Sequence, residues 1–151
     1  MTDINDLKSI IMLTHLKDYM LEKIAKITNI KDYRGGDYIF KEGDEAKNLY
    51  AVIDGKVGLE IEKNSSTHIF FKHINKGMTF GFSALVEIED KSYMDSAKAL
   101  SDTKLFIWKA EDLEALFSQD CEMGFLLMKR IAKIIKTRLQ IRNIQFLDIY
   151  K

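Results

Sequence analysis

The sequence lacks the residues and segments from which several common classes of protein are built. It contains no proline and only one cysteine, Cys121, so it can form no internal disulfide and offers no thiol cluster for zinc or an iron–sulfur centre. No uninterrupted apolar run reaches membrane-spanning length, and the amino terminus carries no signal-length apolar run. We therefore expect a cytoplasmic protein in a reducing environment, with no membrane partner.

Charge and catalytic residue types are equally uninformative about a partner. The 23 basic residues balance the 23 acidic ones, so the formal net charge of zero provides no overall field that attracts nucleic acid. Three scattered histidines and the absence of a GxSxG motif leave no nucleophile with a base, and we expect no enzyme. We expect His68 and His73 to be surface residues; haem ligation by one of them is the alternative. No cofactor is expected.

Periodicity divides residues 1–151 into three zones of a single domain. In residues 1–29 apolar residues recur at helical intervals, with a break expected near Thr14 and His15. Residues 30–109 form short alternating runs between turn residues, which predicts a small antiparallel sandwich or barrel with Asp54-Gly55 as a tight hairpin. Helical spacing returns in residues 110–151, first in EDLEALF and then from about Asp120 to Asp148. The predicted fold is mainly β, with helices at both ends.

Four motifs follow one another in a recognisable order. They are GGDYIFKEGDEAKNLYAVIDGKVGLEI, KGMTFGFSAL, DSAKALSDTKLFIW and a long helix that ends RLQIRNIQFLDIY. In this order they resemble the cyclic-nucleotide-binding domain of the bacterial catabolite-activator and anaerobic-regulator superfamily (CRP/FNR), over nearly the whole chain. The resemblance implies an antiparallel jelly roll, a short phosphate-binding cassette helix over residues 82–87 and a long C-terminal helix.

The resemblance also implies where a ligand would bind. Cyclic-nucleotide binders of the family carry a glutamate directly after Phe-Gly and an arginine just before the Ser/Thr-Ala pair. Here Phe82 stands in the glutamate position and Asp95 in the arginine position. We therefore predict a degenerate pocket that does not accept cyclic AMP in the usual way. Its predicted residues are Phe80, Gly81, Phe82, Ser83, Ala84, Tyr93, Asp95, Ser96 and Ala97.

Other uses of this region stay open on the sequence. Phe82 either packs into the core or lines, with Tyr93 and Met94, an apolar pocket for an unknown small effector. A further alternative is an authentic cyclic-nucleotide receptor in which other side chains replace the two anchors. We retain both alternatives as hypotheses.

The hydroxyls and the thiol near this region have ordinary structural interpretations. Ser83 and Ser96 are expected to cap turns, and the alternative is a small anion bound to them with charge from Lys91 or Lys98. Cys121 is expected to be a buried, inert thiol; the alternative is a thiol whose pKa is lowered at a helix N-terminus.

The last helix predicts a homodimer. The residues that step by three and four along it are Leu127, Ile131, Ile134, Arg138 and Ile141. We expect the first half of this series to pack on the β core and the second half on a symmetric mate, with Arg138 setting the register. The basic residues of the helix are interpreted as a solvated face, not as a DNA footprint: Lys129, Arg130, Lys133, Lys136 and Arg142.

The segment FLDIY near the end resembles the hinge that leads into a helix-turn-helix domain in regulators of this superfamily. The sequence contains no recognition helix after it, so we expect no DNA binding by this chain alone. Two explanations remain open: a stand-alone sensor domain, or the effector half of a transcription regulator cut at the hinge. In either case the sequence predicts a regulatory domain.

Overall fold

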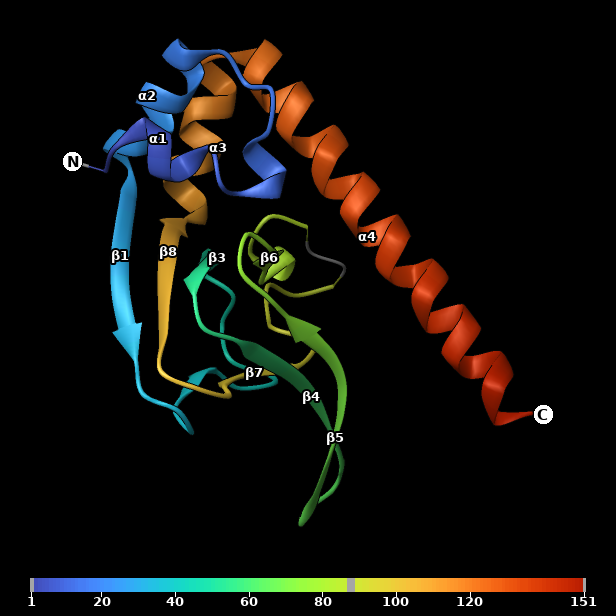
Figure 1. Ribbon diagram of the computed structural model, residues 1–151. Helices are drawn as coiled ribbons and strands as arrows, with labels where there is room; N and C mark the ends of the chain where they lie inside the picture. The colour runs from blue at the N-terminus through green and yellow to red at the C-terminus, as the bar shows by residue number, and fades with distance from the viewer. Residues whose placement is uncertain (1, 87–88, 151) are drawn as a thin grey trace.

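Helices flank a two-layered β core in the computed structural model, which describes residues 2–86 and 89–150 (Figure 1). Two four-stranded antiparallel sheets have the orders β1-β8-β3-β6 and β2-β7-β4-β5. This topology confirms the predicted antiparallel jelly roll. The strands are β1 (Thr28–Tyr33), β2 (Tyr38–Phe40), β3 (Asn48–Asp54), β4 (Val57–Asn64), β5 (Thr67–Ile74), β6 (Thr79–Phe80), β7 (Ser96–Ala99) and β8 (Thr103–Lys109).

The N-terminal zone is helical and is interrupted where the sequence predicts. It contains α1 (Ile4–Leu7), the 3-10 helix η1 (Ile11–Leu13) and α2 (Asp18–Lys26). Between η1 and α2, His15 adopts a left-handed φ of 65°, which ends the helical path at the predicted break. Strand β1 begins at Thr28, so the β region starts two residues earlier than residue 30.

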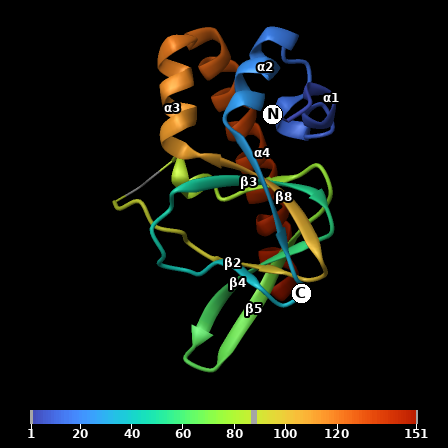
Figure 2. The same cartoon turned by 90° about the vertical axis from the view of Figure 1, so that its left-hand side faces the viewer.

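Two apolar clusters hold the layers together. One lies between the sheets and includes Phe40, Val57 and Phe80. The other joins the first sheet to the helices through Trp108, whose indole N–H donates to the Thr28 hydroxyl at 2.7 Å. Figure 2 shows the N-terminal helices and α3 (Ala110–Gln119) at one end of the β core, and the β4–β5 hairpin at the other. The helices therefore close one end of the jelly roll.

The Asp54-Gly55 turn is not a hairpin, and that prediction is wrong. Strands β3 and β4 on either side of it belong to different sheets, so the turn is a corner at which the chain changes sheet. Gly55 has a φ of 96°, and a Cβ there would lie 2.5 Å from the Thr103 hydroxyl and 2.6 Å from the Asp102 carbonyl oxygen. The Lys56 N–H donates to the same Thr103 hydroxyl at 3.2 Å. The corner is thus built against the β7–β8 turn.

The long helix α4 (Cys121–Ile149) agrees with its predicted bounds to within one residue. Asp120 caps it, because its carboxylate accepts the Met123 N–H at 3.1 Å and lies 3.2 Å from the Lys23 ammonium. Cys121, in the first turn, is exposed. The prediction of a buried thiol is therefore wrong: the residue directly follows the cap, on the solvent side of the helix.

A pair of glycine substitutions tests the corner. Gly55→Ala places a Cβ against backbone and side-chain atoms in a left-handed conformation, whereas Gly43→Ala has a similar φ of 88° with no atom within 4 Å of the new Cβ. We expect Gly43→Ala to lower the free energy of unfolding by about 1 kcal/mol, the cost of the positive φ alone. Gly55→Ala should cost about 3 kcal/mol, because overpacking adds to the strain. Urea unfolding measures the free energy of unfolding of both variants. Equal losses of stability would contradict the close packing of Gly55 against Asp102 and Thr103.

Candidate functional site

The predicted cassette begins where β6 ends. Gly81 follows Phe80 with a left-handed φ of 89°, and a Cβ there would lie 3.1 Å from the Asn48 carbonyl oxygen and from the Tyr50 ring. Glycine is therefore required at this turn. The next residues form the 3-10 helix η2 (Phe82–Ala84), shorter than the helix predicted over residues 82–87, of which residue 87 lies outside the described residues.

The side chains beside the cassette differ in their burial. Tyr93 is buried, stacks on Phe40 with 3.6 Å between ring centroids, and donates its hydroxyl to the Asn48 carbonyl at 2.7 Å. Burial raises the pKa of this phenol well above its usual range. Met94 is 66% exposed. Tyr93 and Met94 thus lie in different environments, and a shared apolar pocket with Phe82 stays an untested alternative.

The serine and lysine residues near the cassette have other partners. Ser96 accepts the Glu42 N–H at 2.8 Å, and Ala97, next to it in β7, is fully buried. The Lys91 ammonium lies 3.5 Å from the Glu114 carboxylate, and that of Lys98 lies 5.4 Å from the centre of the Tyr38 ring. Both lysines therefore have contacts of their own, and the alternative of a small-anion site at Ser83 and Ser96 stays untested.

Arg138 comes from α4 and lies on the cassette of its own chain. Its guanidinium donates a hydrogen bond to the Thr79 carbonyl oxygen, and its central carbon lies 5.2 Å from the centre of the Phe82 ring. Phe82 is half-buried and packs on the helical core cluster. The side chain of Arg138 is therefore engaged within its own domain, and its role in setting the register of a dimer stays a prediction.

Asp95 interacts with the Arg138 guanidinium, and the pKa of its carboxyl group is raised. Burial raises its pKa to about 6, against the opposing attraction of Arg142 and Arg138, and Glu42 adds to the rise. Burial likewise lowers the pKa of Arg138 to about 10, and Asp95 opposes that change. The Arg142 guanidinium lies 4.5 Å from the centre of the Phe71 ring. The β core thus supplies the negative charge and α4 supplies the positive charge.

The predicted dimer residues divide between the core and solvent. Leu127 and Ile131 are buried in the helical cluster of their own domain, and Ile134 packs against it. Ile141 is 38% exposed. Several of the other apolar side chains that α4 exposes belong to a different series, whereas Phe125, Ile144 and Leu147 are exposed outside it. This apolar ridge begins at Met128, which is half-buried against the helical cluster, and continues through the exposed residues Ala132, Ile135, Leu139, Phe146 and Ile149.

The ridge carries a signal that the sequence could have shown. With Arg142 included, its members alternate steps of four and three from residue 128 to residue 149, the spacing of a coiled-coil stripe. The interpretation of the basic residues as a solvated face is wrong in part. Arg130 is half-buried and donates to the Met12 carbonyl at 3.3 Å, whereas Arg142 lies over Phe71 but remains exposed, as predicted.

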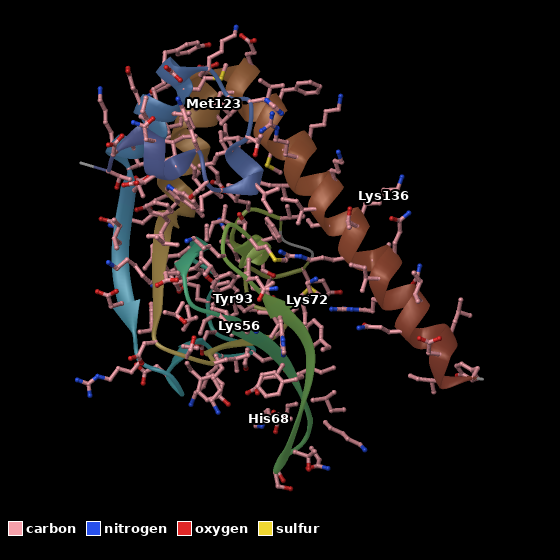
Figure 3. The ribbon with its side chains drawn as sticks, in the orientation of Figure 1. Lys56, His68, Lys72, Tyr93, Met123 and Lys136 are labelled. Carbon is pink, nitrogen blue, oxygen red and sulfur yellow. The ribbon has the colours of Figure 1, made fainter. Side chains whose placement is uncertain are left out.

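The structure supports the prediction for the histidines of β5. His68 and His73 are both exposed, and the described residues contain no group of three or more histidine, cysteine, aspartate or glutamate side chains placed to hold a metal. Figure 3 shows His68 on the protruding part of β5, away from the cassette. Across residues 2–86 and 89–150, no helix combines the length and apolarity needed to cross a membrane.

The jelly-roll topology and the turn at Gly81 together define the class of domain to which the chain belongs. The cyclic nucleotide-binding domain family matches residues 30–120, and the chain belongs to this family. A structure from Geobacter metallireducens, provisionally described as a cyclic nucleotide-binding protein, is 27% identical, with a TM-score of 0.79 over 92% of this chain and 99% of that one. The Thermus thermophilus catabolite activator protein has the same fold, at 24% identity and a TM-score of 0.74 over 92% of this chain and 62% of that one.

Curated relatives are much longer proteins. Human cGMP-dependent protein kinase 2 is 31% identical over 91 residues, which are 58% of this chain and 12% of the kinase. The regulatory subunit of the Drosophila melanogaster cAMP-dependent protein kinase, type II, is 31% identical over 80 residues, or 53% of this chain and 21% of the subunit. The chain therefore corresponds to a small part of each of these relatives.

The raised pKa of Asp95 predicts a pH dependence of stability. A folded pKa of about 6 lies above the unfolded value, so the folded state holds the proton more tightly and the free energy of unfolding falls as pH rises from about 4 to 6. The full shift is worth about 3 kcal/mol, and partial exposure reduces our expectation to about 1–2 kcal/mol. Asp95→Asn should remove this part of the slope.

Urea unfolding of both proteins at several pH values between 4 and 7.5 measures the difference, in which all other titrating groups cancel. A carbon-13 NMR titration of the Asp95 carboxyl gives its pKa directly. A titration midpoint near the ordinary aspartate value of about 4 would contradict the burial of the Asp95 carboxyl group.

Proposed function

We propose that this chain is a regulatory sensor domain, not an enzyme, whose degenerate cassette does not bind cyclic nucleotides in the way the family anchors imply. One arrangement carries the proposal. Asp95 stands where the phosphate-binding arginine is expected, and Arg138 from α4 contacts the cassette at Thr79 and Phe82. A nucleotide phosphate at this position would meet a carboxyl group, and the base would have to displace the arginine.

The energetic cost of this arrangement is large compared with a typical binding free energy. Loss of a charge-assisted arginine bond forfeits about 1.5–3 kcal/mol, and loss of the ribose contact about 1 kcal/mol more. A carboxylate about 4 Å from the phosphate adds repulsion of up to about 4 kcal/mol at an effective dielectric constant of 20. The arginines of α4 and solvent offset part of this sum. A net deficit of about 3–4 kcal/mol weakens binding a few hundredfold.

Isothermal titration of the ligand-free protein with cyclic AMP and cyclic GMP tests the proposal. We expect dissociation constants well above 10 µM, roughly in the submillimolar range, after this loss of affinity. Asp95→Asn should bind more tightly than the unmodified protein at pH 7.5, because the substitution removes a negative charge and keeps the side-chain size. A dissociation constant of about 10 µM or tighter for the unmodified protein would reject the proposal.

That outcome would favour the second candidate, an authentic cyclic-nucleotide receptor. The observation on its side is the similarity to kinases named for their dependence on cGMP or cAMP. A third candidate is the effector half of a transcription regulator. One structure with the same fold is the N-terminal domain of a Streptomyces coelicolor transcriptional regulator, 20% identical with a TM-score of 0.71. DNA binding by this chain alone is not part of any of the three.

We also propose that the sensor is a homodimer formed by the apolar ridge of α4. Leu139 and Phe146 are more than half exposed, and the ridge is a linear stripe that a second copy can match by symmetry. In Figure 1 α4 starts at the helical end of the domain, and its C-terminal half runs obliquely beside the β core. No other element lies on the side of this half that faces away from the β core. A second copy would cover these side chains without displacing Leu127 and Ile131 from the core.

A substitution on the ridge tests the dimer. Leu139→Glu would place two unpaired carboxylates in the symmetric interface, and we expect at least a hundredfold weaker association, since a buried unpaired charge costs about 3–5 kcal/mol. Gln140→Glu adds the same charge one residue along, on the exposed side outside the ridge, and should leave association unchanged. Sedimentation equilibrium measures both. The proposal of a dimer formed by the ridge fails if the unmodified protein is a monomer at tens of micromolar. It also fails if the two substitutions have equal effects.

A further inference from the structure

A pocket of about 520 Å³ lies between α4, β5 and the N-terminal segment that contains η1. Its apolar wall comes from both sides of this space and consists of Ile11, Met12, Met78, Ile134 and Ile141. The Arg130 side chain closes part of the boundary by bonding to the Met12 carbonyl. The pocket has the size and the largely apolar wall of a small-molecule site.

The polar wall of the same pocket is cationic. Lys72, Arg130, Lys133 and Arg138 line it, together with His15, and no carboxylate is among its lining residues. Burial and the neighbouring Arg138 lower the pKa of Lys72. Asp95 attracts Arg138 from the cassette side and does not reach into the pocket lining. Lys72 is therefore partly desolvated, and no carboxylate from the pocket lining balances it or Lys133.

Two of these cationic side chains have no hydrogen-bond or ion-pair partner among the described residues. Arg138 donates to Thr79 and Arg130 to Met12, but the ammonium groups of Lys72 and Lys133 make no hydrogen bond and no ion pair within the described part of the chain. Figure 3 shows Lys72 on the side of β5 that faces α4. Positive charge held near an apolar surface raises the free energy unless an anion approaches it. The site therefore favours a ligand that brings negative charge.

We infer that this pocket binds a small amphipathic organic anion. A carboxylate or phosphate head would lie between Lys72 and Lys133, and an apolar body would cover the wall formed by Met12, Met78 and Ile134. This site is distinct from the cassette, since Phe82, Asp95 and Ser96 are not among its lining residues. The pocket also differs from the apolar ridge. Leu127 and Ile131 mark the side of α4 that faces the core. At 3.6 residues per turn, the ridge residues lie to one side of this direction and the pocket residues of α4 lie to the other. A homodimer would leave the pocket accessible.

The inference deepens the proposed function by naming a class of effector, and its test is separate from the nucleotide titration. The probe is 1-anilinonaphthalene-8-sulfonate, an aromatic anion whose fluorescence rises on binding. Competitors are decanoate and octyl phosphate, which have different anionic heads, and decanol, which has no charge. We expect both anions to displace the probe and decanol to displace it at least tenfold less well, which is about 1.4 kcal/mol.

Substitutions locate the bound probe. Lys72→Gln and Lys133→Gln should each weaken probe and decanoate binding about tenfold, the effect of about 1.4 kcal/mol from one charge-assisted contact. Lys136→Gln is the matched control: it removes the same charge three residues along α4, from an exposed side chain outside the pocket, which Figure 3 shows pointing away from the β core. It should bind as the unmodified protein does. Lys133 is exposed, so its substitution should leave folding intact, which thermal unfolding checks.

Equal binding by Lys133→Gln, Lys136→Gln and the unmodified protein would overturn the inference. So would displacement by decanol as effective as that by decanoate, which indicates a purely apolar surface, or no displacement by either anion at about 1 mM, an affinity of only about 4 kcal/mol. Displacement by cyclic AMP that depends on Lys72 and Lys133 would support the anion pocket and contradict the proposed exclusion of nucleotides. The two proposals can therefore fail separately.

Discussion

The contact between Arg138 and the cassette is the interaction on which the position of the second half of α4 depends. The first half is fixed by burial, because Leu127 and Ile131 are in the helical core. Beyond Ile134 no residue of the helix is fully buried, so apolar packing alone does not hold it there. The guanidinium supplies the missing contacts through the Thr79 carbonyl, the Phe82 ring and the attraction of Asp95. Phe82 and Asp95, which stand at the two expected anchor positions, thus contribute to the support of the helix.

Local sequence patterns predicted the elements of the fold better than their pairing. The helical zones and the long helix follow from apolar spacing, and the break at His15 follows from its interruption. Asp54-Gly55 shows the limit of this reasoning. A left-handed glycine suits a hairpin and a corner equally well, and the choice was decided by Thr103, which is 48 residues from Gly55 in the sequence and packs against it in space.

The candidate site was predictable to the same extent. Phe82 and Asp95 could be placed by counting from Phe-Gly and Ser-Ala, since the turn glycine and the strand fix their positions. The role of Arg138 could not, because its acceptor lies 59 residues away in the chain and depends on how α4 is rotated on the core. The rotation of α4 on the core also explains why the sequence pattern alone could not tell core residues of this helix from residues available to a dimer. Leu127 and Met128 begin two series with the same spacing, and only burial shows that Leu127 and Ile131 of the first face the core, whereas Ile135 and Leu139 of the second are exposed.

Arg138 links these features into one arrangement. It bonds to the cassette on one side and lines the anion pocket on the other, while the apolar ridge occupies the opposite flank of the same helix. An anion in the pocket would compete with Asp95 for the same positive charge, and a shift of α4 would move the ridge with it. Under thermodynamic linkage, any ligand that changes the preferred position of α4 changes dimer affinity, and dimer formation changes ligand affinity by the same factor. If the proposed pocket and dimer are both correct, Arg138 provides a physical route from a bound ligand to the helix.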